Sequence, residues 1–378
     1  MNELQAVTSA AEPPLSRKLH AVGRKLGVPV AGSFELTSRC NFSCGMCYIH
    51  DADQASCAAD ELTAEQWLEI GKQAADAGTV FVLLTGGEPL IRRDFTEIYT
   101  GLKKLGLMIS INTNGSLITD EIAALFEKNP PMRLNISLYA DSEEGYLRQC
   151  GVNAYAQVVS NIRRMKNAGV QVKLNVSFTK NNADRYRQLA DLVRELELHC
   201  QTSVYMYPPV RKSGKPVPCS RLAPSDAASL RVYWDLLRGK NEQLKLSAEQ
   251  LARLAAKDCD EAGAPGEGVR CRAGHTAYWI SASGEMLMCG MIPLSAGNVR
   301  DEGFGFCWQK TRDLMKTVRM PAKCTTCRLR PVCCVCPAAC FAETGDFSKA
   351  PPYLCEMSRS IAMALSRLEK EEPDVKAE

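Results

Sequence analysis

Three cysteines stand close together near the start of the chain, at Cys40, Cys44 and Cys47. Their C-x3-C-x2-C spacing follows a short strand-like stretch, Phe34–Thr37. Thiolate-rich sites select iron–sulfur clusters or zinc, and three thiolates leave the fourth iron of a [4Fe–4S] cube open to a small molecule. A structural zinc site is the alternative, but it usually takes two paired C-x2-C knuckles, and no second knuckle lies nearby. The motif therefore predicts a cluster with one open iron.

A glycine pair and a glutamate follow the next apolar stretch, Val80–Leu84. In the turn Gly86-Gly87-Glu88, the glycines let the backbone approach a ligand closely, and the carboxylate offers an acceptor for an ammonium group. The turn lies at the carboxyl end of a predicted strand, where barrel enzymes build their active sites. It is therefore a candidate ligand-binding turn beside the cysteine motif.

Together the two motifs resemble the signature of the radical S-adenosylmethionine (SAM) superfamily. The resemblance implies that SAM binds the open iron through its amino and carboxylate groups. One electron from the cluster then cleaves SAM into methionine and a 5′-deoxyadenosyl radical. By the same resemblance Gly86, Gly87 and Glu88 form the GGEP motif that contacts the SAM amino group, and a reduced flavodoxin or ferredoxin supplies the electron.

Four further residues occupy positions that bind SAM in relatives. Asn114 lies in a "TNG"-like element, and Ser137 and Arg148 match a serine and an arginine that bind the SAM ribose and carboxylate. A guanidinium suits a carboxylate because of its planar fork of donors, although Arg148 is equally read as a solvated helix residue. Tyr48 is a candidate to lie against adenine, with an ordinary packed tyrosine as the alternative.

Apolar strands alternate with amphipathic helices from residue 33 to about 207, as in a parallel α/β sheet with right-handed crossovers. Thr63 to Gln66 has the form of a capping box at the start of one helix. Periodicity alone leaves an open barrel and a doubly wound sheet both possible, and the resemblance favours a partial (β/α)6 TIM-like barrel. The predicted strands are Phe34–Thr37, Val80–Leu84, Met108–Thr113, Arg133–Leu138, Val172–Phe178 and Thr202–Tyr207.

A second group of cysteines follows in the last third of the chain, and its order resembles the SPASM domain of radical SAM enzymes that modify peptides and proteins. That domain binds two auxiliary [4Fe–4S] clusters. The resemblance assigns auxiliary cluster I to Cys271, Cys289 and Cys336, and auxiliary cluster II to Cys324, Cys327, Cys333 and Cys355.

Some assignments in this group stay open. The gap from Cys333 to Cys336 is two residues where the family has three, and Cys334 and Cys340 lie close enough to replace Cys336. The fourth ligand of cluster I is Cys259, another cysteine, or a substrate thiolate on a free iron. The role of Cys307 is undefined. A zinc ribbon would explain the close cysteines alone but not the whole set.

The expected organisation has five parts: an N-terminal extension at 1–32, the barrel at 33–222, a helical linker at 223–257, a small cysteine-rich SPASM domain stabilised by its clusters at 258–357, and a C-terminal helix and tail at 358–378. In the extension His20 and its basic neighbours are expected on a solvated helix face. The remaining cysteines are expected to be simple buried or surface thiols: Cys57, Cys150, Cys200 and Cys219.

Composition limits the choice of partners and compartment. The net charge of +3 comes from 46 basic and 43 acidic residues, so neither a nucleic-acid nor a membrane partner is expected. No run is apolar enough to span a bilayer, and the first residues lack a secretory signal. Eighteen cysteines in a chain that is not exported indicate that the thiols bind metal rather than form disulfides. We therefore expect a cytoplasmic metalloprotein.

The resemblance favours a radical SAM maturase that abstracts hydrogen from a ribosomally made peptide and installs a thioether or a carbon-centred crosslink. The alternative within the family is an anaerobic sulfatase-maturating enzyme that forms formylglycine; such enzymes carry an aspartate where this chain has Gly290. The alternative from another class is an iron–sulfur electron carrier or redox sensor. Because only Met1–Arg39 precedes the first motif, any leader-recognition domain is expected on a separate protein or absent.

Overall fold

The computed structural model describes residues 14–48, 60–209, 220–255 and 271–368. Cys57, Cys219, Cys259 and the first residues of the expected SPASM domain, 258–270, lie outside these residues. Within the described segments, no helix has the length and apolar character needed to cross a membrane.

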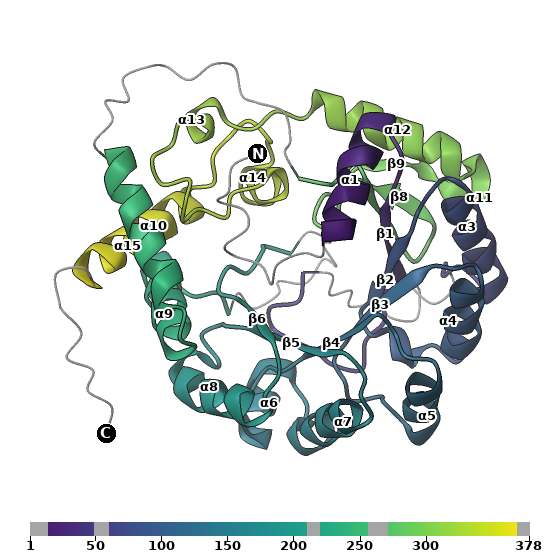
Figure 1. The fold of residues 1–378 in the computed structure, drawn as a ribbon, viewed down its shortest axis with the longest axis horizontal. Coiled ribbons are helices and arrows are strands. Elements are labelled where there is room, and N and C mark those ends of the chain that lie inside the picture. Colours follow the sequence, from purple (N-terminus) through teal and green to yellow (C-terminus); the bar gives the residue numbers. More distant parts are fainter. Residues whose placement is uncertain (1–13, 49–59, 210–219, 256–270, 369–378) are drawn as a thin grey trace.

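Six parallel strands form the curved sheet of a partial barrel, with helices on its outer side (Figure 1). All six predicted strands are present, and the match is complete at Met108–Thr113. The last one differs most, because it begins and ends earlier than Thr202–Tyr207. The strands are β1 (Ala31–Thr37), β2 (Phe81–Gly86), β3 (Met108–Thr113), β4 (Arg133–Ser137), β5 (Val172–Ser177) and β6 (Cys200–Ser203).

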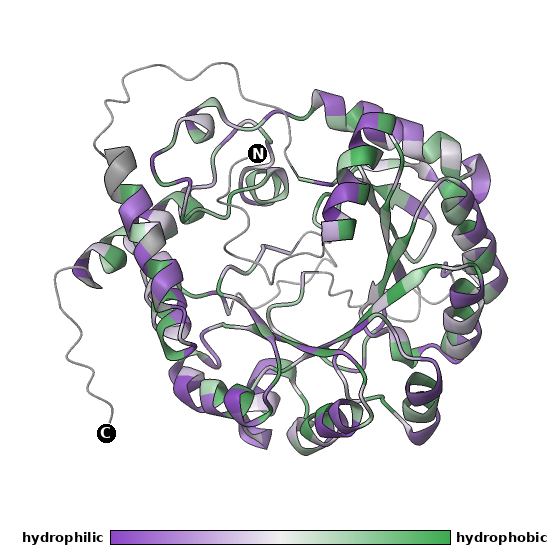
Figure 2. Cartoon of the chain, in the orientation of Figure 1, coloured by the Kyte–Doolittle hydropathy of each residue, from purple (hydrophilic) through white to green (hydrophobic). Residues whose placement is uncertain are grey.

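The helices on the outer side of these strands carry both hydrophilic and hydrophobic residues (Figure 2), and their buried residues are mainly apolar. Thr63 caps α3 with the expected reciprocal capping box, and the buried Trp67 of that helix stacks on Phe34 of β1 at 5.2 Å between ring centroids. The helical elements are α3 (Ala64–Asp76), η2 (Pro89–Ile91), α4 (Phe95–Lys104), α5 (Asp120–Lys128), α6 (Glu143–Cys150), α7 (Tyr155–Asn167), η3 (Ala183–Arg185) and α8 (Tyr186–Glu195).

The barrel sheet continues into the C-terminal part of the chain. Strand β7 (Ala277–Ile280) pairs in parallel with β1, and β8 (Glu285–Leu287) and β9 (Ser295–Asn298) extend the sheet antiparallel. The order β6-β5-β4-β3-β2-β1-β7-β8-β9 leaves β6 and β9 as the edges, so the barrel is open. The barrel and the cysteine-rich region therefore share one sheet.

Helices of the C-terminal half complete the fold, and α15 packs along α9 (Figure 1). The expected C-terminal helix begins earlier than residue 358, so that Cys355 lies within it. These helices are α9 (Pro224–Leu237), α10 (Asn241–Ala255), α11 (Val299–Glu302), α12 (Phe304–Thr317), α13 (Ala322–Thr325), α14 (Pro337–Thr344) and α15 (Pro352–Leu368).

The N-terminal helix α1 (Pro14–Leu26) corrects one expectation. Its basic residues are exposed as expected, but His20 is buried and its Nδ1 lies 2.8 Å from the Thr276 hydroxyl. His20 therefore belongs to the contact between α1 and the segment leading into β7. A spacing argument could not show this, because the two partners are 256 residues apart.

Candidate active site

The three N-terminal cysteines lie on one loop at the carboxyl end of β1, and all three are half-buried. The pKa of the Cys40 thiol is raised to about 12, mainly by burial and also by the charges of Glu88, Cys44 and Cys47. The Phe42 N–H opposes this by donating to the Cys40 sulfur at 3.4 Å. Clustered thiols of this kind lose their protons when a metal binds, because the metal replaces the proton as the positive partner.

Helix α6 supports this loop from the side. The N–H groups of Ser43 and Gly45 donate to the carbonyls of Cys150 and Gln149, at 2.9 and 3.2 Å. The Cys150 thiol is fully buried, and its hydrogen bond to Cys44 raises the pKa of Cys44. Cys150 is a buried thiol as expected, but it also contacts a predicted cluster ligand, which its isolated position in the sequence could not indicate.

The glycine pair brings the turn after β2 directly against the strand that leads to the cysteines. Gly87 N donates to the Thr37 carbonyl at 2.8 Å, and Glu88 N donates to the Arg39 carbonyl at 2.9 Å. A side chain would not fit: an added Cβ would lie 2.2 Å from the Thr37 oxygen at Gly86, and 2.3 Å from the Arg39 oxygen at Gly87. Gly86 also has φ +149°, which other residues rarely adopt.

Glu88 is buried and ties the turn to the end of β3. Its carboxylate accepts from the Thr113 hydroxyl (2.8 Å), from Leu90 N (3.1 Å) and from Asn114 N (2.6 Å). Burial raises the pKa of Glu88 to about 7, although these hydrogen bonds pull it back toward the ordinary value. Each carboxylate oxygen carries two lone pairs, so the group can still accept from a ligand amine.

Asn114 reaches the cysteine loop itself. Its side-chain amide lies 3.9 Å from the Cys40 sulfur and donates to the Asn41 side chain at 2.9 Å, while its oxygen accepts from Ser116. The structure therefore brings together Cys40, Cys44, Cys47, Gly86, Gly87, Glu88 and Asn114 around the carboxyl ends of β1 to β3.

The other three predicted SAM-binding residues lie around this group. Ser137 ends β4 and is half-buried, and Tyr48 is half-buried directly after the cysteine loop. Arg148 lies in the last turn of α6 with its side chain exposed. Tyr139, which the sequence argument did not select, is close to the cysteines: burial raises its pKa, and the charges of Cys44 and Cys150 raise it further.

A buried ion network behind the loop was not predicted. Glu61 accepts from Arg39 at 2.9 and 2.8 Å and also from the Thr37 hydroxyl, and Arg92 lies 3.5 Å away. Arg92 also donates to the carbonyls of Leu36 and Leu62 at 2.8 and 2.9 Å. The network fixes the last residues of β1, but its members are scattered through the sequence, so no spacing could reveal it.

The C-terminal cysteines fall into two neighbourhoods. The pKa of Cys289 is raised to about 11, mainly by burial and also by the charges of Cys336 and Cys271. Burial likewise raises the pKa of Cys324 to about 11, with further contributions from Cys355, Cys333 and Cys327. These neighbourhoods coincide with the sets assigned to auxiliary clusters I and II, and the assignment of individual ligands stays a prediction.

Three extra cysteines lie differently. Cys340 is fully buried. Its pKa is raised to about 12, mainly by burial and also by the charges of Cys324 and Cys336, so it lies beside both neighbourhoods. Cys334 is exposed. Cys307 is buried in α12, where burial and the charge of Glu302 raise its pKa to about 11.

The predicted donor set is all thiolate, and each of its three groups contains three or four cysteines. Sets of three or four thiolates are the ligands of [4Fe–4S] clusters, so the residues present fit such clusters.

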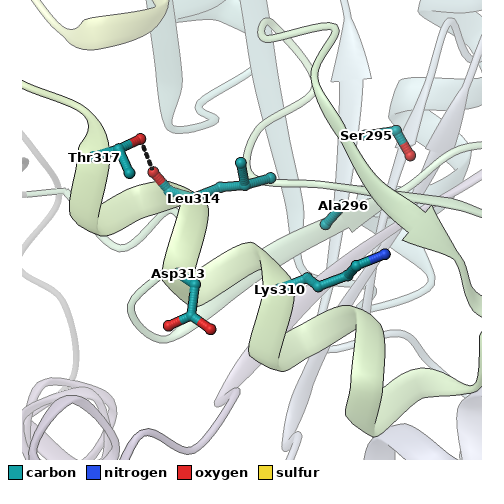
Figure 3. A pocket seen from close by; sticks show the side chains of 6 residues that line it. All are labelled: Ser295, Ala296, Lys310, Asp313, Leu314 and Thr317. Atoms are coloured by element: carbon teal, nitrogen blue, oxygen red, sulfur yellow. Dashed lines mark hydrogen bonds between the residues drawn. The ribbon is translucent and has the colours of Figure 1, made fainter.

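A separate surface hollow of about 420 Å³ lies between β9 and α12 (Figure 3). It is lined by Ser295, Ala296, Lys310, Asp313, Leu314 and Thr317. None of these residues is a predicted ligand, and the Thr317 hydroxyl is already bonded to the Leu314 carbonyl at 2.7 Å. We therefore place the active site at the cysteine loop rather than in this hollow.

Comparison with known proteins agrees with this location. Residues 34–193 match the family model of the radical SAM superfamily. The AdoMet-dependent heme synthase of Methanosarcina barkeri is 26% identical over 337 residues, which cover 85% of this chain and 95% of that protein.

Two solved structures share the fold of almost the whole chain. Streptococcus suis SuiB bound to S-adenosylmethionine has a TM-score of 0.65 at 17% identity, covering 93% of this chain and 85% of SuiB. The anSMEcpe structure with bound AdoMet and Kp18Cys peptide has a TM-score of 0.66 at 18% identity, covering 90% and 98%. Residues 34–193, which carry the cysteine loop and the glycine turn, are thus similar to the radical SAM superfamily, and almost the whole chain has the fold of SuiB and anSMEcpe.

Proposed function

We propose that this enzyme removes a hydrogen atom from a ribosomally made peptide and installs a thioether or carbon-centred crosslink. The observation that carries the proposal is the continuous architecture: the site at the carboxyl ends of β1 to β3 and both C-terminal cysteine neighbourhoods belong to one sheet-linked unit. Structures of the same fold hold peptides, namely SuiB bound to precursor peptide SuiA and anSMEcpe with its peptide.

The chain's own residues would bind and orient the reactants. Cys40, Cys44 and Cys47 would hold the cluster, which with SAM supplies the carbon radical that abstracts hydrogen. Glu88 would accept from the SAM amino group, and the Gly86–Gly87 backbone leaves room for that approach. Asn114 donates toward the Cys40 sulfur and would favour extra negative charge on that ligand. The proposed electron donor is a flavodoxin or ferredoxin.

Gly290 argues against the formylglycine-forming alternative. An added Cβ at Gly290 would lie 2.9 Å from three atoms of the Trp279 indole, so an aspartate there requires Trp279 to move. Trp279 is itself held, because its ring N–H donates to the buried Glu35 carboxylate at 2.8 Å. The place that would hold a proton-accepting side chain is therefore filled by an aromatic ring.

The test is anaerobic incubation of cluster-reconstituted protein with SAM, dithionite and synthetic cysteine-containing peptides encoded beside its gene. We expect 5′-deoxyadenosine together with a peptide that has lost two hydrogens, detected by mass spectrometry. Cys44→Ala should abolish both products, and Cys200→Ala, a buried thiol outside every predicted ligand set, should retain them. Failure to form 5′-deoxyadenosine under any condition would leave an electron carrier as the better description.

A second candidate is the formation of heme, which the similarity to AdoMet-dependent heme synthases over 85% of this chain favours. Such a reaction needs an iron-porphyrin precursor in place of a peptide. Offering both substrates to the same preparation separates the candidates. A new heme absorption spectrum with no change in peptide mass would support heme formation and contradict peptide modification.

A further inference from the structure

The chain leaving β6 brings a tyrosine hydroxyl to a predicted ligand of auxiliary cluster I. Tyr207 Oη lies 3.3 Å from the sulfur of Cys336, which is at hydrogen-bonding distance. Cys336 is also the N-cap of α14 and accepts from Ala339 N at 3.4 Å. The Cys336 sulfur therefore has two potential donors, one from the barrel side and one from the helix.

Neighbouring groups hold the Tyr207 ring in place. Its centroid lies 4.9 Å from that of Tyr205, with the rings tilted by 64°. The Tyr205 hydroxyl donates to Glu343 of α14 at 2.8 Å, and Arg221 binds the same carboxylate at 2.6 Å while lying 3.5 Å from the centroid of Tyr353. The guanidinium thus links α14 and α15 next to the Tyr205 ring, against which Tyr207 packs.

The direction of this hydrogen bond follows from the chemistry of Cys336. A cysteine bound to iron is a thiolate, so it has no proton to donate, and the phenol must be the donor. Donors to ligand sulfurs favour the state with more negative charge, which is the reduced cluster, and the reduction potential rises accordingly.

We propose that Tyr207 is a positioning residue of auxiliary cluster I, whose hydroxyl raises the reduction potential of that cluster by donating to Cys336. A raised potential suits a cluster that accepts the electron left on a substrate after bond formation. The inference rests on the proposed function for that use of the electron, and on the predicted ligand set for Cys336. The hydrogen bond itself depends on neither the peptide nor SAM.

The test is a redox titration of the full chain carrying Tyr207→Phe, in a background where Cys40, Cys44 and Cys47 are alanine so that only the auxiliary clusters report. Electron paramagnetic resonance follows the reduced fraction of each cluster. We expect one of the two reduction waves to shift, with its reduced-to-oxidised ratio at a fixed solution potential falling roughly fivefold, as for the loss of one net hydrogen bond. The other wave should stay in place.

Tyr205→Phe is the matched control, because it removes a hydroxyl from the adjoining ring that bonds Glu343 rather than a cysteine. Both variants should retain the iron content of their parent. If the reduction waves of Tyr207→Phe and of the control lie at the same potentials, the proposal is overturned. Loss of one cluster's iron in Tyr207→Phe would also overturn it, since that would make the tyrosine a ligand. Neither the redox titration nor the iron analysis uses the peptide assay, so a failure of the proposed function would be distinguished from a failure of this proposal.

Discussion

Burial shifts the pKa of the Glu88 carboxyl group into the neutral pH range. The fold raises its pKa to about 7, so in the absence of SAM the neutral form is favoured relative to the unfolded chain. Its stabilising contribution is therefore complete below its ordinary pKa near 4.5 and is lost as the pH rises through about 7. A ligand amine that needs the charged form must overcome this preference.

SAM binding is accordingly expected to weaken as the pH falls below 7. Protonated Glu88 cannot accept from the SAM amino group, so the Kd should rise by up to about tenfold per pH unit. Calorimetry on anaerobic reconstituted protein between pH 5.5 and 8 measures this. Glu88→Gln should bind SAM weakly with a flat pH profile, whereas Glu65→Gln, on an exposed turn of α3, should behave as the unchanged protein. A steep profile in Glu88→Gln would assign the titration to another group.

At this scale the sequence predicts a site residue well when its partners are close along the chain. Cys40, Cys44 and Cys47 lie on one short loop, so their spacing in the sequence is enough to predict that they form one site. Glu61 and Tyr207 had no such signal, because their partners Arg92 and Cys336 are 31 and 129 residues away. Long-range contacts of this kind become visible only when the elements are placed in space.

Among the elements, the turn from β2 to η2 has the strictest requirement. Two consecutive backbone N–H groups bond to the carbonyls of Thr37, the last residue of β1, and of Arg39 just after it, at separations that leave no room for a Cβ. Because the obstructing atoms are these backbone carbonyls, they cannot move aside as a flexible side chain could. The turn therefore determines where the cysteine loop lies relative to Glu88.

Gly87→Ala is expected to lower the free energy of unfolding by about 2–4 kcal/mol, through the clash with the Arg39 carbonyl. The displaced strand should also reduce iron incorporation at the N-terminal loop. Urea denaturation and iron analysis measure the two effects. Gly305→Ala is the control, because an added Cβ there meets no atom within 4 Å and the helix α12 should gain slightly. Equal stabilities for both variants would contradict this account of the turn.

The element pattern of the barrel was largely predictable, and that of the C-terminal region was not. Buried parallel strands appear as short apolar runs between turn residues, and all six were identified in this way. The strands β7 to β9 have three or four residues each, which is too short for a period to be seen. Their place in the sheet depends on β1, far away in sequence, so tertiary pairing rather than local propensity determines them.

On the scale of the whole molecule, the cysteine-rich segment depends on its metal more than the barrel does. Between Met320 and Cys336 regular helix is limited to α13, of four residues, although this stretch holds four predicted ligands. The barrel strands, in contrast, bury a continuous apolar core to which this segment contributes only a few side chains, among them the predicted ligand Cys324. Loss of the metal should therefore unfold this segment while the barrel stays folded.

Removal of iron is expected to expose this segment to trypsin while α7 stays resistant. Arg328 and Arg330 are exposed and lie between the predicted cluster II ligands Cys327 and Cys333, and the exposed Lys323 directly precedes Cys324. A released backbone should therefore be cut at these residues at least tenfold faster, roughly as for a local unfolding equilibrium. Mass spectrometry of timed digests before and after chelation measures the rates. Arg163 and Lys166 of α7 serve as the internal control. Equal acceleration at both places would mean that the clusters stabilise the entire molecule.

The shared sheet also has a consequence for biosynthesis. Strand β1 pairs with β2 on one side and with β7 on the other. It emerges early from the ribosome, but β7 begins at residue 277, about 240 residues after β1 ends at residue 37. At ordinary translation rates this is a wait of roughly 10 to 50 s, during which one side of β1 offers unpaired peptide groups to other nascent chains. Productive expression should therefore depend on chaperone capacity during synthesis as well as on the supply of iron and sulfide afterwards.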